Sequence, residues 1–141
     1  MIDYLLVTCE HGGNRVPPRY RSLFRGLQRV LKSHRGYDFG ALLMARQMAA
    51  AFEAPLVAST VTRLLVDLNR SISHPRLHAD TVRTTAHEER QRILAEHYLP
   101  YRAQAEDLIR TAIARGRHVT HISSHSFTAE LNGKVDRKSV V

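Results

Sequence analysis

A short apolar run near the N-terminus ends abruptly in polar residues and two glycines. Residues 4–9 read Tyr-Leu-Leu-Val-Thr-Cys, and they are followed directly by Glu10, His11, Gly12 and Gly13. A continuous apolar run of this length, bounded by glycine, is typical of a strand buried on both faces of a sheet. The chain is therefore expected to begin with a buried strand that opens into a loop, where the glycine pair lets the backbone approach a ligand closely.

Helical and strand-like patterns alternate along the rest of the chain. Apolar residues recur at helical spacing in three segments, namely residues 19–32, 39–52 and 86–115. Strand-like segments stand between and after them, namely residues 55–60, 63–68 and 117–123. Residues 71–85 carry no periodicity and predict a loop. Strands that alternate with helices predict an α/β fold around a largely parallel sheet.

Two of the predicted helices carry further signals. In residues 39–52, the predicted apolar face carries Phe39, Leu42, Leu43, Ala49 and Phe52. Asp38 stands where an N-cap residue would. In the last helix, Pro100 is expected to cause a kink or a split, because proline removes a backbone donor and clashes with the preceding turn.

Length and composition exclude several classes of protein. The 141 residues suffice for one compact domain, and a hydrophobic content of 43% is enough for a core. No apolar run approaches the roughly 20 residues that cross a bilayer, and the N-terminus lacks the pattern of a secretory signal. Cys9 is the single cysteine, which excludes a disulfide framework. We expect a cytoplasmic protein that spans no membrane.

The formal net charge of +8 comes mostly from arginine. A basic chain attracts nucleic acid when its arginines form a patch with interleaved aromatic side chains. Here the basic residues are scattered through residues 15–35 and 83–117 without a tight run. They are interpreted as a solvated surface, and neither nucleic acid nor a membrane is an expected partner.

Two histidines directly follow predicted strands. His11 comes just after the first strand, and His125 comes just after the last. Ligands of parallel α/β sheets bind beyond the carboxyl ends of the strands, where these two side chains would meet. Two neutral imidazoles and one carboxylate can hold Zn²⁺ and leave an open position for water. The alternative is that both are ordinary loop histidines that form hydrogen bonds.

Asp38 and Glu10 compete for the role of the carboxylate ligand. Asp38 is either a ligand or no more than a helix cap, and its position alone favours the cap. Glu10 directly precedes His11, so the two side chains diverge if the strand continues. The pattern of residues leaves this choice open.

A second polar group follows the strand-like residues 63–68. Arg70 can clamp a carboxylate or phosphate, Arg63 can reach the same anion, and Asp67 is expected to orient its neighbours. The alternative for the arginines is a surface salt bridge. Without a metal, the same basic residues would make the chain a non-catalytic anion-binding module, which is the alternative function.

Cys9 lies two residues before His11, on the same face of an extended strand. This spacing permits the cysteine–histidine pair of a thiol hydrolase. A lone cysteine at the end of an apolar strand is more often a small buried core residue, and we favour that interpretation.

Four segments, taken together and in this order, resemble the N-formylglutamate amidohydrolase family: residues 7–17, 34–41, 63–71 and 123–127. The resemblance extends from about residue 4 to about residue 133. It implies a three-layer αβα fold with a mostly parallel mixed sheet, related to that of zinc carboxypeptidases and aspartoacylases.

The resemblance also implies a reaction. It is the hydrolysis of the amide of N-formylglutamate, or of a similar small acidic N-acyl amino acid, by water that Zn²⁺ activates. The implied zinc ligands are His11, Asp38 and His125, and the implied carboxylate-binding residues are Arg63, Asn69 and Arg70.

The end of the chain carries a separate expectation. Members of the family are longer, and their general-base glutamate lies in a C-terminal part that does not align with this chain. Residues 136–141 read Asp-Arg-Lys-Ser-Val-Val, which is the translation of a common sequencing-adaptor sequence. We expect residues 1–135 to be the N-terminal part of a family domain and residues 136–141 to be a non-native tail. The truncated chain is expected to have weak or no hydrolase activity.

Overall fold

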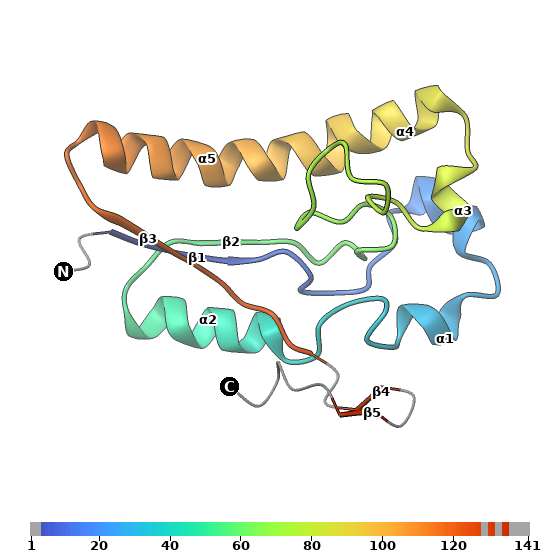
Figure 1. The fold of residues 1–141 in the computed structure, drawn as a ribbon, viewed down its shortest axis with the longest axis horizontal. Helices are drawn as coiled ribbons and strands as arrows, with labels where there is room; N and C mark the ends of the chain where they lie inside the picture. The colour runs from blue at the N-terminus through green and yellow to red at the C-terminus, as the bar shows by residue number, and fades with distance from the viewer. Residues whose placement is uncertain (1–3, 128–129, 132–133, 136–141) are drawn as a thin grey trace.

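A three-stranded parallel sheet lies at the centre of the fold (Figure 1). β1 (Tyr4–Cys9) is the middle strand, between β2 (Leu56–Ala58) and β3 (Val119–Ser123). Both backbone edges of β1 are therefore hydrogen-bonded, and the last four of its residues are buried. The predicted buried first strand is confirmed. The computed structural model describes residues 4–127, 130–131 and 134–135 of the chain.

Helices lie on both faces of this sheet (Figure 1). α2 (Ala41–Ala51) packs against one face, and α5 (Leu99–Ala114) crosses the other. A strand covered on both faces needs apolar side chains on both, which explains the continuous apolar run of β1. The prediction of an α/β fold around a parallel sheet is confirmed. The finer assignment to a mixed, zinc-carboxypeptidase-like sheet stays a prediction.

The buried residues of α2 all have small side chains. They are Ala41, Ala45 and Ala49, which share a core with β1, and Leu42 and Met48 pack against this core partly buried. The spacing of four between the alanines places them on one face, and their size lets the helix lie close to the strand. Phe39 and Phe52, predicted for this face, are 52% and 66% exposed. The predicted face is confirmed for Ala49 and for Leu42, which packs against the same core. It is wrong for Leu43, which is exposed, and for the two phenylalanines, which lie just outside the ends of α2.

The long helical pattern of residues 86–115 forms three consecutive elements. They are α4 (His87–Ile93), the π-helical turn η2 (Leu94–Tyr98) and α5. Pro100 stands in the first turn of α5. The wider π-turn before it relieves the clash that a proline ring makes with a regular preceding turn. The predicted interruption is confirmed, and it takes the form of a π-turn.

Two other helical predictions need correction. Residues 19–32, predicted as one helix, form the 3-10 helix η1 (Pro18–Phe24) and the short α1 (Gln28–Leu31). Gly26 lies between them with a φ of 76°, a left-handed conformation that ends a helical path. Residues 71–85 are largely loop, as predicted, but they include the four-residue α3 (Asp80–Arg83).

Residues 63–68 form turns instead of the predicted strand. Leu65, Val66 and Leu68 are nevertheless buried, because they belong to a second hydrophobic core beside the sheet. The other buried members of this core are Tyr20, Phe24, Val61, Leu77, Val82, Ile93, Leu94 and Tyr98. An apolar run therefore indicated burial correctly here, but not strand pairing.

Gly36 joins two loops that shape the site described below. Its carbonyl oxygen accepts hydrogen bonds from the Thr62 hydroxyl at 2.9 Å and from the Arg63 N–H at 3.3 Å. The backbone here passes so close to the end of α1 that a β-carbon on Gly36 would lie 2.1 Å from the Leu31 carbonyl oxygen. This close approach fixes the loop that carries Asp38.

The C-terminal part of the described chain is a small antiparallel pair, β4 (Glu130–Leu131) and β5 (Lys134–Val135). The predicted non-native tail, residues 136–141, lies outside the described residues. Within the described part, each helix is too short or too polar to cross a membrane.

Candidate metal centre

The predicted site residues come from loops at the carboxyl ends of the parallel strands. Glu10 and His11 directly follow β1, and His125 lies two residues after β3. Asp38 stands in the loop before α2, and its backbone N–H donates to the His11 carbonyl oxygen at 2.9 Å. Parallel pairing of β1 with β3 brings their ends to one edge, so two histidines 114 positions apart meet there.

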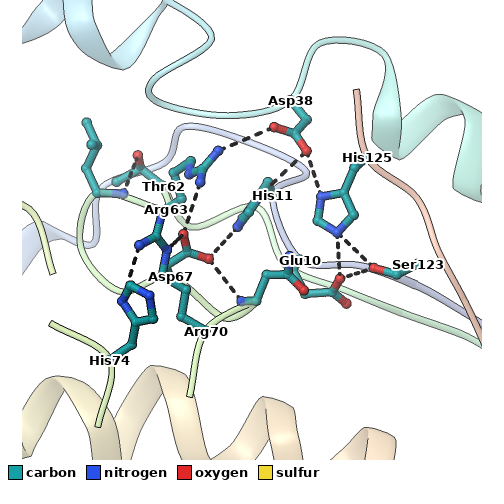
Figure 2. A network of polar contacts seen from close by, with 12 residues as sticks. Glu10, His11, Asp38, Thr62, Arg63, Asp67, Arg70, His74, Ser123 and His125 are labelled. Atoms are coloured by element: carbon teal, nitrogen blue, oxygen red, sulfur yellow. Dashed lines mark hydrogen bonds and ion pairs between the residues drawn. The ribbon is translucent and has the colours of Figure 1, made fainter. Parts of the chain in front are cut away.

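His11, Asp38 and His125 gather their side chains around one point (Figure 2). One ligand atom from each lies within 4.8 Å of the other two. The Asp38 Oδ2 atom lies 3.4 Å from His11 Nδ1 and 2.8 Å from His125 Nδ1. These are the three residues predicted as zinc ligands, and two imidazoles with one carboxylate are a donor set that suits Zn²⁺.

His11 leaves one ring nitrogen available for a metal. Its Nε2 atom lies 2.6 Å from Asp67 Oδ1, so the ring proton is donated there. Its Nδ1 atom is buried and has no hydrogen-bond partner among the described residues. A buried nitrogen lone pair without a partner is costly unless something coordinates it. The orphaned atom faces Asp38 and His125, so the residues present fit a metal ion.

His125 is held in the same manner through its other nitrogen. Its Nε2 atom lies 2.9 Å from the Ser123 hydroxyl and 3.2 Å from Glu10 Oε1. Both histidines thus turn Nδ1 toward the cluster and Nε2 toward a carboxylate, the arrangement that orients histidine ligands of metals. Of the two competing carboxylates, Asp38 lies on the Nδ1 side, whereas Glu10 lies behind His125. The geometry favours Asp38 as the ligand.

Glu10 is held by hydroxyl groups as well as by the imidazole. The Tyr101 hydroxyl donates to Glu10 Oε2 at 2.7 Å, and the Ser123 hydroxyl donates to Oε1. Burial alone would raise the pKa of the Glu10 carboxyl, but the hydrogen bonds from His125, Ser123 and Tyr101 outweigh it and lower the pKa to about 2. Hydrogen bonds to Asp38 and Glu10 likewise raise the pKa of His125 to about 9. Tyr101 has no place in the sequence-based site, although it stands in the segment 86–115, whose apolar residues recur at helical spacing.

Asp67 joins His11 to two arginines (Figure 2). In addition to its hydrogen bond with His11, its carboxylate accepts hydrogen bonds from Arg63 at 3.1 Å, from Arg70 at 3.0 Å and from the backbone N–H of Asn69 at 3.0 Å. Burial would raise the pKa of this carboxyl, but the contacts with His11 and Arg63 outweigh it and hold the pKa below its usual range. Asp67 therefore orients its neighbours, as expected from the sequence.

The three predicted carboxylate-binding residues do not converge on one point. Arg63 lies beside the cluster, 3.7 Å from Asp38 Oδ1. Arg70 is turned toward Asp67 and also lies 3.3 Å from His74 Nδ1, while Asn69 is exposed at the surface. Arg63 is therefore the best placed of the three to meet an anion next to the candidate metal ligands. A clamp built from all three residues stays a prediction.

One local interpretation of the sequence is wrong, and one is extended. Asp38 does not cap α2, because the N-cap residue is Gly40 and, in the part of the chain that is described, its end carries no side-chain cap. The Asp38 carboxylate instead points into the cluster. The glycine pair also passes close to protein backbone, since a β-carbon on Gly13 would lie 2.7 Å from the Thr60 carbonyl oxygen. Its approach to a ligand stays a prediction.

Cys9 is a buried core residue, as favoured above. Burial, reinforced by the charge of Glu10, raises the pKa of its thiol to about 11. We expect native protein to resist alkylation by iodoacetamide at pH 7.5, because the thiolate is both scarce and shielded. Mass spectrometry should find full labelling only after denaturation. Labelling of the native chain at the rate of a free thiol would contradict this burial. It would favour the alternative in which Cys9 and His11 form the pair of a thiol hydrolase.

Two comparisons with known proteins found matches. The crystal structure of a gene product from Agrobacterium tumefaciens superposes with a TM-score of 0.82 at 30% sequence identity. The match covers 94% of this chain and 55% of that one, so the chain spans about half the length of its structural neighbour. A comparison with curated proteins found no match. The family model described as N-formylglutamate amidohydrolase matches residues 4–140, and the chain belongs to this family.

Proposed function

We propose that the chain carries a zinc-dependent amidohydrolase centre for N-formylglutamate or a similar N-acyl amino acid. The observation that carries the proposal is the cluster of His11, Asp38 and His125, with its orphaned Nδ1 atom, in a chain of this family. An ion held there would lower the pKa of a water molecule to about 7 and polarise the scissile carbonyl.

The chain's own residues have separate tasks in this proposal. Asp67 and Glu10 fix the rings of His11 and His125, so that each Nδ1 points at the ion. Arg63, beside Asp38, offers its guanidinium to the carboxylate of the substrate. Such a contact orients the amide toward the metal, and correct orientation lowers the barrier because the reacting groups are already in place.

Metal content tests the proposal directly. The purified 141-residue chain is expected to retain about one zinc ion per molecule after dialysis, measured by mass spectrometry of the element. His11→Ala and His125→Ala should each lose it, because two protein ligands hold zinc weakly. His87→Ala is the matched control, since His87 is exposed at the start of α4. A wild-type chain without zinc, or equal zinc in all variants, would favour the metal-free anion-binding module.

We also propose that the 141-residue chain turns over N-formylglutamate weakly or not at all. Hydrolysis needs a general base, and the carboxylates at the described site already accept from other groups. Asp38 is hydrogen-bonded to His125. Asp67 is hydrogen-bonded to His11 and to two arginines. Glu10 accepts hydrogen bonds from Tyr101 and Ser123. Zinc-saturated protein should release formate at a rate close to that of the buffer. Zinc-dependent release that disappears in His11→Ala would contradict this expectation.

A further inference from the structure

A pocket of about 420 Å³ opens beside the candidate metal centre. Asp38, one of the three candidate ligands, and Arg63, the candidate anion partner, both line it. Three aromatic side chains, Tyr37, Phe39 and Phe127, form much of the remaining wall. A group of the substrate that extends from the scissile amide would enter this pocket, because the candidate ligand Asp38 forms part of its wall.

The aromatic rings of this pocket are unusually open to water. Phe39 is 52% exposed and Phe127 is 59% exposed. The Tyr37 and Phe39 rings meet edge to face, with their centroids 4.9 Å apart. Exposed aromatic side chains gathered at one concave site are typical of a binding surface, since contact with an apolar ligand removes their rings from water.

The charges around the pocket limit what it can hold. Arg63 is the guanidinium among the described residues that line it, and it already contacts Asp67 and Asp38. It can meet one carboxylate of a bound amino acid. The other lining residues are His34 and Ser126, neither of which has the fixed positive charge of a guanidinium. A second carboxylate, such as that of a glutamate side chain, would lie among the aromatic rings and near Asp38, where desolvation and like charge both oppose it.

We infer that this pocket selects an N-acyl amino acid with an apolar, preferably aromatic, side chain, and that Phe39 and Phe127 determine this specificity. The inference rests on the proposed function and narrows its substrate class. Arg63 binds the single carboxylate, the amide lies toward His11, Asp38 and His125, and the apolar side chain packs among the rings.

Ligand binding tests the inference without any need for turnover. Isothermal titration of the zinc-saturated 141-residue chain compares N-formylphenylalanine with N-formylglutamate. The expected result is an affinity for N-formylphenylalanine at least tenfold higher. Phe39→Ala and Phe127→Ala should each lower that affinity several-fold.

Phe52→Ala is the matched control for these variants. Phe52 is 66% exposed, directly follows α2, and does not belong to the described lining of the pocket. It should change neither affinity. Equal or tighter binding of N-formylglutamate, binding of neither compound, or no effect of Phe39→Ala and Phe127→Ala would overturn the inference. The zinc content of the same samples tests the proposed function separately. A chain without zinc would overturn the metal centre. The preference between the two compounds would still decide the role of the pocket.

Discussion

Replacing Asp67 with asparagine is expected to lower the free energy of unfolding by about 3 kcal/mol and to weaken zinc binding about 10- to 100-fold. The carboxylate is buried and accepts hydrogen bonds from His11, Arg63 and Arg70. An amide of the same size cannot balance the charge of the arginines, and it no longer fixes the ring of His11. Both arginines are partly exposed, so water offsets part of the loss.

Asp80→Asn is the matched control for this variant. Asp80 also pairs with an arginine, Arg83, but both side chains are exposed. Such a pair contributes about 0.5 kcal/mol or less. Urea unfolding and zinc titration of the two variants supply the comparison. If Asp67→Asn costs no more than Asp80→Asn in either measurement, Asp67 does not hold the site together.

The stabilisation from Asp67 also has a defined dependence on pH. Its carboxyl has a pKa below the ordinary value in the folded state, so its contribution is fully present above the unfolded pKa of about 4. The contribution is lost as the pH falls from there toward the folded pKa. The difference in stability between wild type and Asp67→Asn should therefore shrink as the pH falls below about 4.

Gly36→Ala is expected to destabilise the fold by about 3 kcal/mol. The added β-carbon would lie 2.1 Å from the carbonyl oxygen of Leu31 and 2.7 Å from its carbonyl carbon. These are backbone atoms, which cannot rotate away as the end of a side chain can. The loop would have to move, and with it the Gly36 carbonyl that binds Thr62 and the nearby Asp38.

Gly26→Ala separates crowding from backbone conformation. Gly26 has a φ of 76°, and no atom of the described residues lies within 4 Å of a β-carbon placed on it. The cost there is the left-handed conformation alone, about 1 to 2 kcal/mol. Denaturant unfolding of both variants, with zinc titration as a second measurement, should show a larger loss for Gly36→Ala. Gly36→Ala, unlike Gly26→Ala, should also weaken zinc binding. Equal effects of the two variants in both measurements would contradict the role given to the close approach of Gly36 to Leu31.

The placement of His11 and His125 could be predicted because it follows from the sheet. Each histidine comes just after a strand, and parallel pairing brings the ends of β1 and β3 to one edge. The role of Asp38 could not be predicted from position, since a loop before a helix suits both a cap and a ligand. Its orientation depends on the backbone N–H that binds the His11 carbonyl and on the fixed loop at Gly36.

Contacts between distant segments account for what sequence patterns missed. Tyr101 reaches Glu10 across 91 positions, and no local period records such a contact. Residues 63–68 looked like a strand because apolar side chains gather there, yet they pack into a loop core. The predicted apolar face of α2 was right for Ala49 and wrong for Phe39 and Phe52, which lie just beyond the two ends of the helix.

The π-turn before Pro100 sets the rotational phase of α5. The Leu99 N–H binds the carbonyl of Leu94, five residues back, so this turn holds one residue more than a regular turn. One residue corresponds to a rotation of roughly 100° about the helix axis. With a regular turn in its place, α5 would keep its direction but present another face to the sheet. The hydroxyl of Tyr101 would then point away from Glu10, so a single extra residue in one helix aligns a contact made 91 positions away.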